Sequence, residues 1–163
     1  MLQITPPHRA PGPAGPASPR SPAHILSLAF DLPEAVQYIA HLRRTALCFL
    51  EGMGISRDDA NDVELLLGEL ATNAVRHARG GSYHVDLEFF EDRAVVTVTD
   101  NGIGFEKENL PPPGARPFDI LHSEGEARIG GFGLPLVHSI ADTVDITPNS
   151  PHGTVVRAEK RFR

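Results

Sequence analysis

Proline is distributed so unevenly that it separates a segment without a core from a segment that can fold. Seven of the 15 prolines lie in the first 24 residues of this 163-residue chain. That segment has too little apolar surface to offset the entropy lost on ordering, so we expect residues 1–24 to form a disordered tail. Residues 25–163 have the length of one domain with a hydrophobic core.

Charge and cysteine content exclude several classes of protein. The tail contains two arginines and no acid, so residues 25–163 carry 13 basic and 21 acidic residues, a formal net charge of −8. This balance argues against direct binding to nucleic acid, which needs a clustered basic surface. The single cysteine, Cys48, excludes an internal disulfide. No apolar run approaches the roughly 18 residues of a membrane span, so we expect a cytoplasmic protein without a membrane partner.

The periodicity of apolar residues predicts helices and strands in an order typical of an α+β fold. Asp31 with Glu34, and Ser56 with Asp59, have the spacing of capping boxes and predict the starts of the first two helices. We expect helices on one face of a mostly antiparallel, mixed sheet. The predicted strands are 25–30, 83–90, 94–99, 144–147 and 154–159, and the predicted helices run from about 33 to 52, 56 to 80 and 133 to 141.

The second predicted helix carries polar residues on the border of its apolar face. At about 100° per residue, Glu69, Asn73 and His77 fall on one stripe. Such a stripe is often only a solvated helix edge, and His77 alone would more simply pack near the helix end. Asn73 is harder to explain in this way. Asparagine is a mediocre helix former, and its side-chain oxygen suits a hard cation such as Mg²⁺.

Two glycine-containing segments have features of a nucleotide site. Asp100, Gly102 and Gly104 directly follow a strand, where a carboxylate can accept a hydrogen bond from an exocyclic amine and glycines let a flat ring approach. Gly131 and Gly133 precede a helix, whose free N–H groups and dipole favour an anion. Each segment alone is also explained by a turn or by packing. Neither the dinucleotide fingerprint nor the P-loop pattern is present.

A further glycine-containing segment, Gly153-Thr154, lies in the last predicted hairpin, where a turn alone would explain it. In their order and spacing, the four segments resemble the nucleotide-binding boxes of the GHKL superfamily of gyrase, heat-shock chaperone, histidine-kinase and mismatch-repair ATPases. The resemblance covers about residues 25–163 and implies a two-layer α/β sandwich, the Bergerat-type ATP-binding fold. Within the superfamily the chain is most similar to the anti-sigma-factor serine-kinase branch, through Glu-Leu-x-Thr-Asn-Ala-x-x-His at 69–77 and Arg-x-Gly-Gly-Phe-Gly-Leu at 128–134.

The resemblance implies a role for each matching residue. Glu69 would act as the general base, and Arg128 would lie near the terminal phosphate of ATP. Asn73 would bind the Mg²⁺ that bridges the phosphates, and Asp100 would accept a hydrogen bond from the adenine amino group. Residues 106–129 would form a mobile lid over the nucleotide. Further nucleotide contacts would come from His77, Gly102, Gly104, Gly131, Phe132, Gly133, Leu134 and Thr154.

The activity that the resemblance implies is an ATP- and Mg²⁺-dependent serine/threonine protein kinase that acts as an anti-sigma factor. Its partners would be a sigma factor and an anti-anti-sigma antagonist protein, and the resemblance is compatible with a homodimer. The antagonist would supply the seryl or threonyl hydroxyl whose proton Glu69 accepts. The alternative is a non-catalytic ATP-binding module, in which the nucleotide orders the lid and thereby controls docking of the partner.

Overall fold

Five strands form one antiparallel sheet. The computed structural model describes residues 22–77, 81–102 and 133–163. The strands are β1 His24–Pro33, β2 Ser82–Phe90, β3 Arg93–Asp100, β4 Thr143–Pro148 and β5 Thr154–Arg161. They lie in the order β1-β2-β3-β5-β4, and each neighbouring pair is antiparallel. The chain therefore returns to the centre of the sheet with its last strand, which pairs with β3 and β4.

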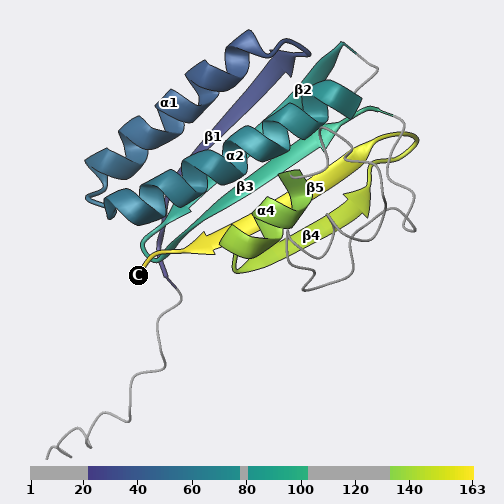
Figure 1. The fold of residues 1–163 in the computed structure, drawn as a ribbon. Coiled ribbons are helices and arrows are strands. Elements are labelled where there is room, and N and C mark those ends of the chain that lie inside the picture. Colours follow the sequence, from purple (N-terminus) through teal and green to yellow (C-terminus); the bar gives the residue numbers. More distant parts are fainter. Residues whose placement is uncertain (1–21, 78–80, 103–132) are drawn as a thin grey trace, which may run out of the picture.

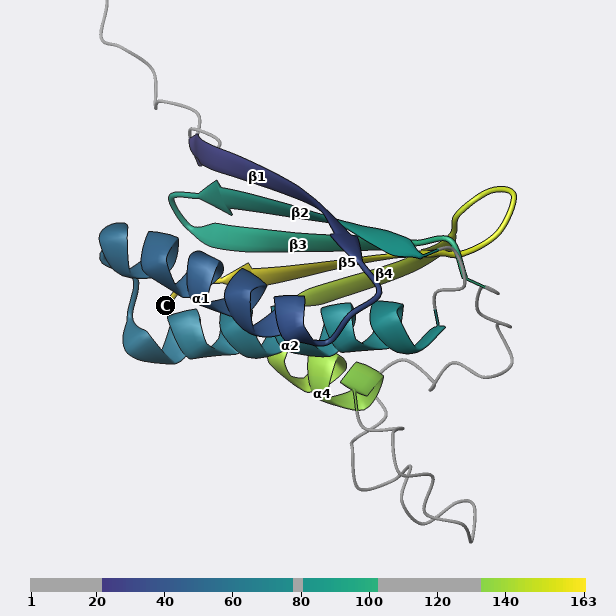
Figure 2. The ribbon, with the colours of Figure 1, turned by 90° about the horizontal axis from the view of Figure 1, so that it is seen from above.

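In the described part of the chain, three helices cover one face of the sheet: α1 Gln37–Gly52, α2 Arg57–His77 and α4 Gly133–Ile140. Figures 1 and 2 show α2 across the middle of the sheet, with α1 on one side of it and α4 on the other. The predicted α+β sandwich is confirmed. Within the described residues, no helix is both long and apolar enough to cross a membrane.

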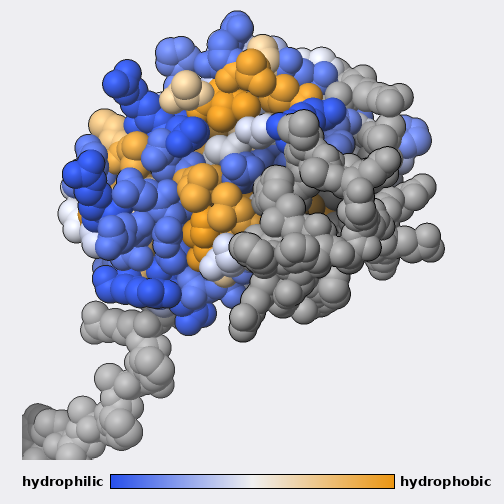
Figure 3. All heavy atoms as spheres, viewed as in Figure 1, coloured by the Kyte–Doolittle hydropathy of each residue, from blue (hydrophilic) through white to orange (hydrophobic). Residues whose placement is uncertain are grey.

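The core lies between the helices and the sheet because the strands alternate. In β2, every second residue from Tyr83 to Phe89 is buried, while the residues between them face away from the helices. The buried face of α2 packs on this surface. Figure 3 shows the outside of the helical layer, where apolar surface remains over parts of α1 and α4.

The first helix begins later than the capping pattern predicted. The strand β1 includes Asp31, and α1 starts only at Gln37, without a side-chain hydrogen bond at its N-cap. Asp31 Oδ1 lies 2.7 Å from His84 Nδ1 on β2, and Glu34 Oε1 accepts a hydrogen bond from Gly81 N at 2.7 Å. The predicted capping box at 31–34 is therefore wrong, because both acidic residues bond to the neighbouring strand segment instead of capping a helix.

The second helix begins as predicted. Asp59 N donates to Ser56 Oγ at 3.2 Å, and the Ser56 hydroxyl donates to Asp59 Oδ2 at 2.8 Å. Asp59 is only 4% exposed, and its carboxylate also accepts a hydrogen bond from Arg163 N at 3.0 Å. Burial tends to raise the pKa of this carboxyl, but these hydrogen bonds and the charges of Lys160 and Arg163 lower it below its usual range. The start of α2 is thereby attached to the end of the chain.

Candidate nucleotide-binding site

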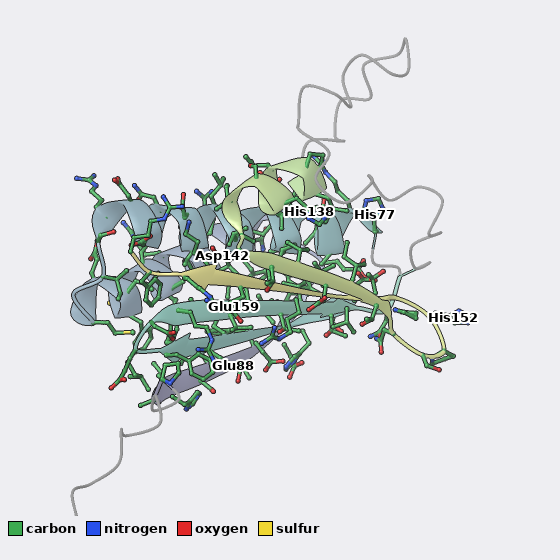
Figure 4. The ribbon with its side chains drawn as sticks, turned by 90° about the horizontal axis from the view of Figure 1, so that it is seen from below. His77, Glu88, His138, Asp142, His152 and Glu159 are labelled. Atoms are coloured by element: carbon green, nitrogen blue, oxygen red, sulfur yellow. The ribbon has the colours of Figure 1, made fainter. Side chains whose placement is uncertain are left out.

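A pocket lies between the C-terminal half of α2, the sheet and the start of α4. Most of its lining is apolar, and the polar groups come from Asn73 and His77 on α2 and from Asp100 at the end of β3. Figure 4 places His77 at the end of α2. An apolar pocket with a few polar groups is typical of sites for small ligands. The apolar lining consists of Leu70, Ala74, Val98, Leu134 and Val156.

The first residue of α4 lies against two polar side chains of α2. A Cβ atom at Gly133 would lie 3.0 Å from both Glu69 Oε2 and Asn73 Nδ2, so a larger residue would have to displace them. The N-terminus of a helix presents unpaired N–H groups and a positive dipole. The fold therefore places a helix end that favours anions beside a carboxylate and an amide, whose oxygens suit a hard cation.

The carboxylate of Asp100 is held in place at the end of β3. Asp100 is 7% exposed, and its Oδ1 accepts a hydrogen bond from Gly102 N at 2.8 Å. With one oxygen occupied in this way, the other can accept a hydrogen bond from a ligand in the pocket. Thr154, the cross-strand partner of Asp100 on β5, is 3% exposed. Asp100 therefore lines the pocket from a position that is paired with a buried threonine on β5.

Two glycines allow backbone segments to meet around Asp100. A Cβ atom at Gly102 would overlap His77 O, and one at Gly153 would overlap Asp100 O. Gly153 also has a φ of +113°, a backbone angle that residues with a side chain rarely adopt. The turn that the sequence predicts at Gly153 is present, and the close approach of Asp100 O also excludes a side chain at this position.

Asn149, which lies between β4 and β5, is a residue of the site's framework that the sequence motifs did not indicate. Its Nδ2 donates to Asp100 O and to Asn101 Oδ1, each at 3.0 Å. The turn between β4 and β5 is thereby attached to the loop that follows β3. The two segments are 49 residues apart along the chain, so no local pattern could indicate this bond.

The structure brings together the predicted site residues that it describes. Four of them line the pocket: Asn73, His77, Asp100 and Leu134. Gly133 lies against Glu69 and Asn73, while Gly102 and Thr154 adjoin Asp100. Their roles in binding remain predictions. The predicted site residues that lie in the described part of the chain are Glu69, Asn73, His77, Asp100, Gly102, Gly133, Leu134 and Thr154. Four other predicted site residues lie outside the described residues: Gly104, Arg128, Gly131 and Phe132. The predicted lid at 106–129 and residues 1–21 of the predicted tail lie outside them as well.

The sandwich and its pocket have the organisation expected for an ATP-binding domain of the GHKL type. The family described as "Histidine kinase-like ATPase domain" matches residues 32–160. The chain belongs to this family.

Known proteins with similar sequence are named as kinases. The serine-protein kinase RsbW of Bacillus cereus (strain Q1) is 30% identical over 118 residues, which cover 71% of this chain and 73% of that protein. Its counterpart in Bacillus anthracis (strain CDC 684 / NRRL 3495) matches to the same extent, 30% over 118 residues with 71% and 73% covered. A chain in the crystal structure of the SiaB-SiaC complex from Pseudomonas aeruginosa shares the fold, with a TM-score of 0.57 at 14% identity over 82% of this chain and 89% of that chain.

Proposed function

We propose that the protein is an ATP- and Mg²⁺-dependent serine/threonine protein kinase that acts as an anti-sigma factor in the cytoplasm. The observation that carries the proposal is the junction at which Gly133, the first residue of α4, lies against Glu69 and Asn73 beside the pocket. The names of the RsbW relatives support serine as the acceptor. The proposed partners are a sigma factor and an anti-anti-sigma antagonist protein, and the proposed assembly is a homodimer.

In the proposed mode of binding, a purine base would occupy the end of the pocket near Asp100, and the phosphates would lie at the other end. Asp100 would accept a hydrogen bond from the adenine amino group, while Leu70 and Val98 would contact the ring. The phosphates would then lie toward the start of α4, whose N–H groups favour anions. Because the folded part of the chain has a net charge of −8, this local attraction has to overcome a repulsive overall field.

The residues at the junction fit a magnesium ion. A side-chain amide and a carboxylate lie close enough together that a single Cβ at Gly133 would contact both. Carboxylate and amide oxygens are the side-chain ligands that Mg²⁺ takes in proteins, usually together with phosphate oxygens and water. Asn73 would hold the ion through its side-chain oxygen. When bound, the ion supplies neutralisation of phosphate charge.

Glu69 would act as the general base in phosphoryl transfer. It would accept the proton of a seryl or threonyl hydroxyl on the antagonist as that oxygen bonds to the γ-phosphorus. The bond from the γ-phosphorus to the bridging oxygen breaks, and ADP leaves. The N–H groups at the start of α4 would stabilise the charge on the transferred group. This division of labour fits phosphoryl transfer, which depends more on positioning and charge stabilisation than on covalent catalysis.

The test is transfer of label from Mg-[γ-³²P]ATP to proteins that the purified chain captures from its source organism. We expect label on a serine or threonine of one captured protein. The variant Glu69→Gln should keep ATP binding and lose transfer by about 10²- to 10⁴-fold. Glu64→Gln is the matched control, because Glu64 lies on the same helix but pairs with Arg43 at 3.0 Å.

Two results would contradict the proposal in different ways. If calorimetry detected no binding of Mg-ATP, the nucleotide site itself would be refuted. If ATP bound but no captured protein was labelled, and Glu69→Gln regulated its partner as the wild type does, the protein would be the non-catalytic ATP-binding module instead.

A further inference from the structure

A buried lysine joins three elements at the end of α4 that lies away from the pocket. Lys160 on β5 is 5% exposed. Its Nζ lies 2.7 Å from Asp62 Oδ2 on α2 and donates a hydrogen bond to the carbonyl oxygen of Ile140, the last residue of α4, at 3.3 Å. Lysine is almost never buried unless it is paired, so this side chain is retained at a cost that its contacts must offset.

The residues after α4 are fixed at the same place. Asp142 N donates to Glu159 O at 2.8 Å, and Arg161 N donates to Asp142 Oδ2 at 2.7 Å. Figure 4 shows Asp142 and Glu159 close together, and His77 toward the other end of α4. The C-terminal end of α4 is therefore attached to β5 by its own last carbonyl and by the turn that follows.

The two ends of α4 are close enough to be coupled by a rigid helix. The helix has eight residues, which corresponds to a length of about 12 Å. Its first residue, Gly133, lies against Glu69 and Asn73, and its last carbonyl accepts the hydrogen bond from Lys160. A helix this short moves as a unit, so a shift at one end changes the position of the other.

We propose that Lys160 is a positioning residue for the nucleotide site, acting through α4. A cation at the C-terminus of a helix complements its dipole, and Asp62 holds the ammonium group in place. Without Lys160, the last carbonyl of α4 loses its hydrogen bond to β5 and its link to Asp62 on α2, and only the turn at Asp142 still attaches this end of the helix to the strand. The start of the helix then no longer keeps its position against Glu69 and Asn73. This inference rests on the proposed function, because it concerns the same site.

The neighbouring residue Asp59 provides a matched comparison. Like Lys160, it is buried and attaches the C-terminal end of the chain to α2, through Arg163 N. Its hydrogen bonds join α2 to itself and to Arg163, and its link to Lys160 is the attraction between the two charges; none of these contacts is to α4. If Lys160 only stabilises the fold, Lys160→Met and Asp59→Ala should both lower the melting temperature and leave nucleotide binding unchanged. A positioning role predicts that only Lys160→Met changes the site.

The experiment measures nucleotide affinity and helix protection in the same variants. We expect Lys160→Met to raise the Kd for a non-hydrolysable Mg-ATP analogue roughly tenfold and to speed hydrogen exchange in α4. Lys160→Arg should restore most of the affinity, because it also presents donors and a positive charge. Asp59→Ala should lower the melting temperature but leave both the Kd and the exchange of α4 unchanged.

The outcomes separate this inference from the proposed function. A wild type that does not bind the analogue would overturn the proposed function and this inference with it. A wild type that binds, with Lys160→Met binding equally well and α4 equally protected, would overturn the inference alone. If Lys160→Met does not fold, Asp62→Asn replaces it and should raise the Kd by about threefold; an unchanged Kd in Asp62→Asn would contradict the inference.

Discussion

The two ends of α2 use similar residue types in opposite ways. At the N-terminal end, Ser56 and Asp59 are bonded to each other, and Asp59 is bonded to the end of the chain. At the C-terminal end, Asn73 and Asp100 line a pocket, and Glu69 lies at its border beside the start of α4. Polar groups that bond within the protein stabilise the fold, whereas polar groups that line a pocket are available to a ligand. Substitutions at the two ends should therefore separate stability from activity.

After Glu69→Gln, the largest effect is expected from Gly133→Ala at the pocket end. The added Cβ would contact Glu69 and Asn73 at 3.0 Å and displace the ends of both side chains. Both side chains would have to give by a few tenths of an ångström. Since a misplacement of about 1 Å in a catalytic group can cost roughly 10²-fold in rate, we expect phosphoryl transfer to fall by roughly 10- to 30-fold.

The control for this variant is Gly52→Ala. A Cβ at Gly52 meets nothing within 4 Å, so transfer should be unchanged. Thermal unfolding of both variants should show that neither loses much stability. If Gly133→Ala transferred phosphate as fast as the wild type, the start of α4 would not be part of the active site.

A smaller loss is expected from Asp100→Asn, which preserves the shape of the side chain. The amide oxygen can still accept the hydrogen bond from Gly102 N, but an amide is a poorer acceptor for the adenine amino group than a carboxylate. Calorimetry should show an affinity for ATP about tenfold weaker and a smaller preference for ATP over GTP. Asp86→Asn, on the other face of the sheet, is the control. An unaltered preference for ATP would show that Asp100 does not contact the base.

Sequence reasoning succeeded where a feature depends on neighbours in the chain. The phase of α2 follows from its apolar residues, so the shared stripe of Glu69 and Asn73 could be predicted. The contact of both with Gly133 could not be predicted from local pattern, because it joins residues far apart in sequence. The order of motifs suggested the nucleotide site, but only the fold shows that Asn73, Asp100 and Leu134 line one pocket.

Sequence reasoning failed where tertiary contacts overrode a local preference. Asp31 and Glu34 have the spacing of a helix cap, yet β1 continues through this segment because it pairs with β2. Lys160 shows the same limit. It lies just beyond the last predicted strand, 154–159, and its contacts with Asp62 and Ile140 depend on how α2, α4 and β5 meet.

At the N-terminal end of α2, Asp59→Ala should reduce stability without affecting nucleotide binding. Loss of a residue that supports a helix start costs typically about 1 kcal/mol, and the freed Arg163 N–H adds to this. Because the pKa of Asp59 is lowered in the folded protein, its contribution is fully present above the ordinary value of 3.8 and is lost as the pH falls through the folded value. Urea unfolding should therefore show a difference in the free energy of unfolding between wild type and variant, and this difference should close below pH 3.8. A difference that persisted at low pH would point to lost packing instead of lost charge.

The smallest effect is expected on the exposed side of the sheet, where polar groups bond to each other but remain in contact with water. The hydrogen bond with Asp31 raises the pKa of His84, partial burial opposes this, and Asp86 adds to the increase. The resulting stability is fully present below the ordinary pKa of 6.5 and is lost as the pH rises through the folded value. Asp31→Asn should lower the pKa of His84 in an NMR titration, while Asp145→Asn on β4 should not. Because the pair is exposed to solvent, the change in unfolding free energy should stay below about 1 kcal/mol, less than that of Asp59→Ala. A larger change in the free energy of unfolding would mean that an exposed ion pair can stabilise the fold as much as the buried hydrogen bonds of Asp59 do.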